Sequence, residues 1–151
     1  MYEDNQTKFA CVLNSRTPLP RALNAAFHAL IGLMGRLTPE NAELLDYPFK
    51  GGNPTSLISR HPVIVLQARN GNQLRTLLAQ AADRKIHANL FASSMLGASA
   101  ADQQAQTWAV GIEDADVFAV ALFGAASEID PLTRKFSVFR CSEGETDNAA
   151  G

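Results

Sequence analysis

The sequence has no strong excess of charge of either sign. Its 13 basic and 15 acidic residues give a net charge of -2 at pH 7, and the pI is about 5.9. Proteins that bind nucleic acid usually carry a basic excess, because neutralising phosphate groups supplies most of their non-specific affinity. The charge balance argues against nucleic acid as a general partner. It does not exclude tRNA as a specific one.

Cysteine is also scarce, with Cys11 and Cys141 far apart and at no disulfide or metal spacing. Cys11 lies in the apolar run 9–13, which predicts a buried small hydrophobe. The polar N-terminus does not resemble a secretory signal, so we expect a reducing, cytoplasmic setting. No His and Cys cluster, phosphate loop or dinucleotide fingerprint is present, so we expect neither a metal nor a cofactor.

No long hydrophobic run occurs. The longest, residues 22–35, is interrupted by Asn24 and His28 and is shorter than the roughly 20 apolar residues of a membrane span. We therefore expect no membrane association. The length suits one domain over residues 1–151, with polar tails at 1–7 and 142–151.

Short apolar runs alternate with stretches of helical periodicity. The runs predict four strands and a short extended segment, at residues 9–13, 63–68, 86–91, 117–123 and 136–140. Alternating strands and helices indicate an α/β fold with helices on both faces of a sheet. Residues 47–62 contain three prolines and two glycines and predict an ordered loop or flap.

The first helix has two apolar stripes. One holds large residues at steps of three and four, namely Leu19, Leu23, Phe27, Leu30, Met34 and Leu37; the other holds the small residues Ala22, Ala25, Ala29 and Gly32. The small stripe predicts close packing. Thr17 is the expected N-cap, with Pro18 at the first helical position.

The start of this helix is the best candidate for a ligand site. Free backbone amides and the helix dipole favour an anion there, and Arg16 and Arg21 add positive charge. Arg21, Asn24 and His28 share one helical face. The alternative is a solvated first turn, with both arginines in water and an internally hydrogen-bonded histidine.

Ser93 and Ser94 follow the third predicted strand. In open α/β sheets, ligands bind beyond the carboxyl ends of strands, so we expect residues 14–21 and 92–99 to face one pocket. No glycine-flanked elbow surrounds either serine, and turn formation is the alternative role.

Two segments resemble type II peptidyl-tRNA hydrolases. Residues 23–29 (LNAAFHA) resemble the first helix of that family, and residues 123–124 and 128–139 resemble its closing segment. The sequence resembles most closely a bacterial family catalogued as a domain of unknown function, number two thousand. That resemblance spans roughly residues 8–140.

The resemblance implies a three-layer α/β/α fold of the peptidyl-tRNA hydrolase II type, with a mixed sheet of about four strands, and a homodimer. The hydrolases carry a lysine where Arg21 stands, and an aspartate-alanine-glycine segment where residues 91–95 are FASSM. Arginine keeps the charge but changes the geometry, and the missing acid removes the group that would orient a lysine or a water.

Two functions remain open from the sequence. The favoured one is a non-catalytic or divergent relative that binds a small anionic ligand at the first strand–helix turn; the alternative is a divergent hydrolase of peptidyl-tRNA or a related acyl ester. The candidate ligand-binding residues are Arg16, Thr17, Arg21, Asn24, His28, Ser93 and Ser94, and no catalytic residue is assigned. A third hypothesis, compatible with both, is self-association through the small-residue stripe or an exposed strand.

Overall fold

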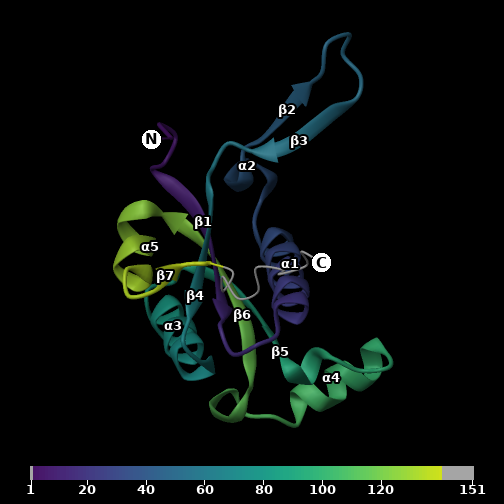
Figure 1. Cartoon of the computed structure of the whole chain (residues 1–151), viewed down its shortest axis with the longest axis vertical. Coiled ribbons are helices and arrows are strands. Elements are labelled where there is room, and N and C mark those ends of the chain that lie inside the picture. Colours follow the sequence, from purple (N-terminus) through teal and green to yellow (C-terminus); the bar gives the residue numbers. More distant parts are fainter. Residues whose placement is uncertain (1, 141–151) are drawn as a thin grey trace, which may run out of the picture.

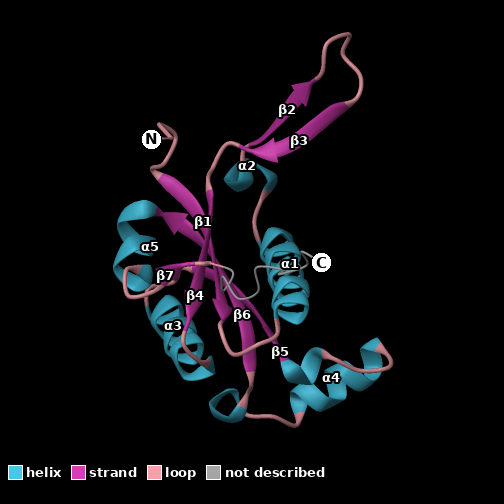
Figure 2. Ribbon diagram, viewed as in Figure 1, coloured by secondary structure: helices cyan, strands magenta, loops and turns pink. Residues whose placement is uncertain are grey.

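A computed structural model describes residues 2–140, in which a mixed five-stranded sheet is flanked by helices (Figures 1 and 2). Its strands are β1 (Thr7–Asn14), β4 (Val63–Ala68), β5 (His87–Ala92), β6 (Val117–Ala125) and β7 (Ser137–Val138). The order is β5-β6-β1-β4-β7, with β1 and β4 parallel and all other pairs antiparallel. The expected mixed sheet is confirmed, but it has five strands rather than four, because part of the extended segment 136–140 pairs with β4.

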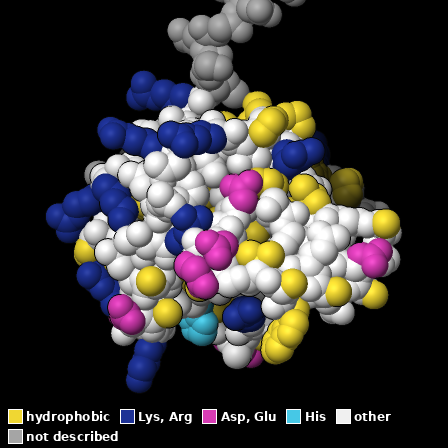
Figure 3. Space-filling view, turned by 90° about the horizontal axis from the view of Figure 1, so that it is seen from below, with side chains coloured by type: hydrophobic (Ala, Val, Ile, Leu, Met, Phe, Trp, Pro, Cys, Tyr) yellow, Lys and Arg dark blue, Asp and Glu magenta, His cyan; other side chains and the backbone are white. Residues whose placement is uncertain are grey.

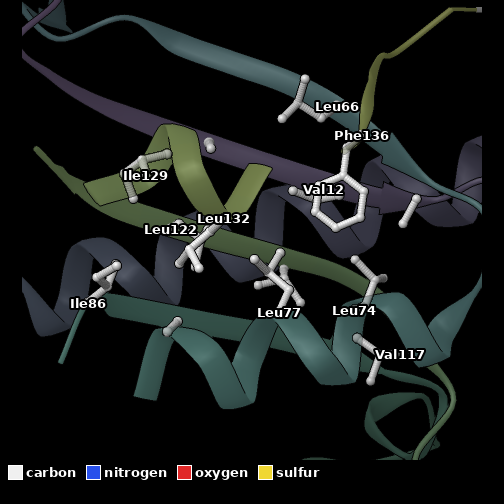
Figure 4. Close-up of a cluster of buried hydrophobic side chains, with 14 of the residues drawn as sticks. Val12, Leu66, Leu74, Leu77, Ile86, Val117, Leu122, Ile129, Leu132 and Phe136 are labelled. Atoms are coloured by element: carbon white, nitrogen blue, oxygen red, sulfur yellow. The ribbon is translucent and has the colours of Figure 1, made fainter. Parts of the chain in front are cut away.

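Helices cover both faces of this sheet. On one face lies α1 (Leu19–Arg36); on the other lie α3 (Gly71–Asp83) and α5 (Ala126–Thr133). Successive residues of a strand point to opposite faces. Ala10 and Val12 of β1 therefore join the cluster under α3 and α5 shown in Figure 4, while Cys11 and Leu13 pack against α1.

The small-residue stripe of α1 packs directly on the sheet, as its composition predicts. Ala22, Ala25 and Ala29 are buried. A Cβ atom on Gly32 would lie 2.2 Å from Nδ2 of Asn89, which donates a hydrogen bond to the carbonyl oxygen of Ala29 at 3.0 Å. The stripe is thus used within the chain, and the hypothesis that it forms a dimer contact is wrong.

The predicted stripe of large apolar residues on α1 is only partly covered: Leu37 is buried, and Leu30 and Met34 pack against the core. Leu23 is 39% exposed, Phe27 is 61% exposed and Ile31 is 70% exposed. The exposed members Leu23 and Phe27 share one flank of the helix with Ile31, which was not part of the predicted stripe, and the sheet does not cover that flank. Small residues form most of the contact between α1 and the sheet, because they let the helix backbone approach the strands most closely.

The expected cap at Thr17 is wrong. α1 begins at Leu19, because Pro18 has extended backbone angles (φ -53, ψ 139), and no side chain caps this end. The Thr17 amide donates to the carbonyl oxygen of Asn14 at 3.0 Å, which places Thr17 in the turn before the helix.

The remaining helices are short or peripheral. They are α2 (Pro39–Ala42), α4 (Ala100–Trp108) and two single 3-10 turns at Ser93–Met95 and Ile112–Asp114. Ser99 caps α4, since its hydroxyl accepts from the amide of Asp102 at 3.2 Å. No helix between residues 2 and 140 combines the length and apolar character needed to cross a membrane.

Residues 47–62 are not a loop. Most of this segment belongs to an antiparallel hairpin of β2 (Leu44–Pro48) and β3 (Thr55–Ser59), which projects from the body of the molecule in Figure 1. Gly51 and Gly52, at φ +89 and +83, form the connection. This second sheet has only two strands, so both of them are edge strands. A proline at the end of such a strand removes no backbone hydrogen bond that the sheet requires. Cys141 and the predicted polar tail 142–151 lie outside the described residues.

Candidate functional site

A cleft lies where β1 and β4 end. Because these strands are parallel neighbours, the turn from β1 to α1 and the turn from β4 to α3 meet at one edge of the sheet. The cleft has a volume of about 400 Å³. Its walls are the turn at 14–18, the start of α3 at 70–72 with Arg75, and residues 114–116 with Phe118.

Asn14, the last residue of β1, fixes the shape of this cleft. Its side chain is only 4% exposed. Its Nδ2 donates to the carbonyl oxygen of Val117 at 3.0 Å, and its Oδ1 accepts from the amide of Arg16 at 3.0 Å. The amide of Ser15 donates to the carbonyl oxygen of Ala68 at 2.9 Å. The turn is thereby tied to both β6 and β4.

The first turn of α3 supplies hydrogen-bond donors to the same cleft. Asn70 caps the helix by accepting from the amide of Gln73 at 3.1 Å. Gly71 and Asn72 stand in the first turn, where a helix leaves its amides without intrahelical acceptors. Amides in this position favour an anion.

Charges of both signs surround the cleft. Arg16 is exposed beside it, and Arg75 is held in place by hydrogen bonds to the carbonyl oxygen of Ala115, at 2.6 Å, and to Oδ1 of Asn72. Asp114 and Asp116 line the opposite part. Figure 3, which views the molecule from below, shows basic and acidic side chains next to each other at this end. The arrangement suits a small anion better than a polyanion.

The sequence-predicted residues fall into two groups. Arg16 and Thr17 line the cleft and also an adjoining hollow of about 680 Å³ that reaches Phe139. Arg21 lines neither, and the same holds for Asn24, His28, Ser93 and Ser94.

Of the second group, His28 lies where α1 passes over β5, and Ser93 and Ser94 follow that strand. The ring of His28 stacks on that of Phe91, with 5.4 Å between centroids, and Phe91 stands two residues before Ser93. Ser94 Oγ accepts from Thr107 Oγ1 at 3.0 Å. No residue of 92–99 lines the cleft, because β6 lies between β5 and β1 in the sheet.

Two further groups of reactive side chains bear on the chemistry. Burial raises the pKa of Cys11 to about 12, so its thiol stays protonated at neutral pH and is no nucleophile. Between residues 2 and 140, no three His, Cys, Asp or Glu side chains gather closely enough to hold a metal ion.

Sequence reasoning missed Arg75 and the start of α3 as parts of the site. Asn70-Gly71-Asn72 was recognisable as a turn into a helix after an apolar strand. Its place beside Arg16 depends on β4 being the parallel neighbour of β1, which the order of elements along the chain does not show.

Together, the fold and the cleft define an α/β protein with a mixed five-stranded sheet and an open pocket at the ends of its one parallel pair. A family model described as "Protein of unknown function (DUF2000)" matches residues 7–140, and the chain belongs to this family.

The chain is also similar to a solved structure, that of a protein of unknown function from Agrobacterium tumefaciens. The TM-score is 0.76 at 22% sequence identity, and the match covers 89% of this chain and 98% of that chain. At this identity the likeness shows the fold alone. No curated protein matches the chain.

Proposed function

We propose that the protein binds a small anionic ligand in the cleft at the β1–α1 turn and does not transform it chemically. The observation that carries this proposal is the position of Arg16 beside the first turn of α3, across a cleft of about 400 Å³. A guanidinium group and free helix amides are two independent means of holding a phosphate or carboxylate.

The rest of the cleft limits the size and charge of the ligand. Arg75 already donates to protein oxygens, which leaves Arg16 as the main mobile cation. Asp114 and Asp116 repel additional negative charge on the far side. A ligand with one anionic group and a neutral or cationic remainder therefore fits best.

A thermal-shift screen with an anionic metabolite panel tests this function. A ligand at about 100 times its dissociation constant should add roughly 2.7 kcal/mol to the free energy of unfolding. Arg16→Ala should lower that affinity by about tenfold or more, the equivalent of about 1.4 kcal/mol. Arg134→Ala, which removes the same charge at the exposed end of α5, is the matched control. A panel in which no compound raises the melting temperature contradicts the proposal.

A divergent hydrolase of peptidyl-tRNA or a related acyl ester is the second candidate, with a fold of the peptidyl-tRNA hydrolase II type. The resemblance of residues 23–29 and 128–139 supports it. So does the stack of His28 on Phe91, because it places a potential general base over the strand that leads to Ser93 and Ser94.

Turnover assays on peptidyl-tRNA and on simple aminoacyl esters test the second candidate. If His28 is the base, His28→Ala should lower the rate by about 10²-fold or more, while Arg16→Ala in the separate cleft should change it little. A wild-type rate no higher than that of Arg21→Ala would end the hydrolase hypothesis and leave the binding function untouched.

A further inference from the structure

One flank of α1 is apolar and uncovered. Phe27 and Ile31 are more than half exposed, and Leu23 lies one turn before them. The opposite flank faces β5, as the stack of His28 on Phe91 shows. The apolar flank therefore faces β4.

The uncovered surface continues from α1 onto the sheet. Val63 and Val65 of β4 are exposed, and they pair with Phe9 and Cys11, whose side chains point to the α1 face. β7 pairs with Leu66 and Gln67, and the amide of Phe139 donates to the carbonyl oxygen of Val65 at 3.0 Å. The start of β4, at Val63 and Ile64, has no partner on this edge among residues 2–140 and lies beside an apolar face.

The β2–β3 hairpin carries a second set of uncovered apolar side chains. They are Leu44, Tyr47, Phe49, Leu57 and Ile58, all exposed. The two strands pack mainly on each other, and their five residues reach about 17 Å from the body. An isolated two-stranded hairpin is at best marginally stable in water, so this arm needs a covering surface.

We propose that the hairpin of one copy lies across the apolar flank of α1 and β4 in a second copy, and the reverse, to form a twofold dimer with two identical arm contacts. The exposed apolar side chains of the flank, the strand and one face of the arm together reach the order of the about 800 Å² that each partner buries in a standard interface.

The charge distribution along α1 favours a second copy as the occupant of this face. Along residues 19–35 the only Arg or Lys is Arg21, on the flank that faces β5, so two copies meet here without like-charge repulsion.

Sedimentation of the full chain at micromolar concentration tests the dimer. The wild type should sediment as a dimer, and Phe27→Asp on the flank or Leu57→Asp on the arm should each weaken it by at least about thirtyfold, as expected for buried anchor residues. Trp108→Asp changes a 93% exposed tryptophan on α4, away from the proposed contact, and should leave the dimer intact.

Mixing the two variants distinguishes the arm exchange from a folding defect. A mixed pair has one contact with both variants and one contact with neither, so an equimolar mixture of Phe27→Asp and Leu57→Asp should recover dimer that neither forms alone. A monomeric wild type, or dimers that survive both substitutions, would overturn the proposal. No recovery on mixing would overturn the exchange of arms.

Discussion

Replacing Asn14 with leucine is expected to lower the free energy of unfolding by about 2–4 kcal/mol, since it leaves two hydrogen-bonding groups without partners at about 1–3 kcal/mol each. Leucine matches the size of asparagine but can neither donate to the carbonyl oxygen of Val117 nor accept from the amide of Arg16, as Asn14 does. Val117 is fully buried, so water cannot replace the lost donor. Chemical denaturation of the variant measures the change.

The matched control is Asn24→Leu, the same exchange on the exposed surface of α1. It should change the free energy of unfolding by no more than about 0.5 kcal/mol. Because Asn14 holds the turn that carries Arg16, the variant at Asn14 should also lose ligand affinity, whereas the control should keep it. Equal stability of the two variants would mean that Asn14 does not organise the cleft.

Leu33→Ala is expected to lower the free energy of unfolding by about 2–5 kcal/mol, the range for a fully buried leucine whose removal leaves a cavity. Leu33 is 0% exposed and packs with Phe9 and Phe123 on the sheet. The cost should appear in denaturant unfolding as a lower midpoint with an unchanged slope.

Ile31→Ala, two residues earlier on the same helix, is the comparison that separates the two sides of α1. Ile31 is 70% exposed, so in the monomer the substitution should cost no more than about 0.5 kcal/mol. It should instead weaken the proposed dimer. Comparable destabilisation of the monomer by both substitutions would contradict the orientation of α1 described above.

The main strands and α1 were predictable because their signals are local. Continuous apolar runs such as residues 117–123 mark strands that are buried on both faces, and β6 is indeed buried over most of its length. The hairpin was not predictable in the same way. Its strands are five residues long, with proline at or next to their ends, and both faces are exposed, so no apolar alternation marks them.

The cleft was predictable only in part. The rule that ligands bind beyond strand ends correctly directs attention to the end of β1, and Arg16 and Thr17 do line the cleft. Arg75 and Asn72 lie there because β4 pairs with β1 across two intervening helices and a hairpin. That long-range pairing also explains why Ser93, two strands away, is separated from Arg16.

A titration of backbone amide resonances with inorganic phosphate tests the proposed ligand site most directly. If the cleft binds an anion, saturable shifts should centre on the amides of Thr17, Gly71 and Asn72, and Arg16→Ala should abolish them. Shifts centred instead on Arg21, His28 and Ser93, or small unsaturable shifts over the whole chain, would contradict the assignment of the cleft as the anion site.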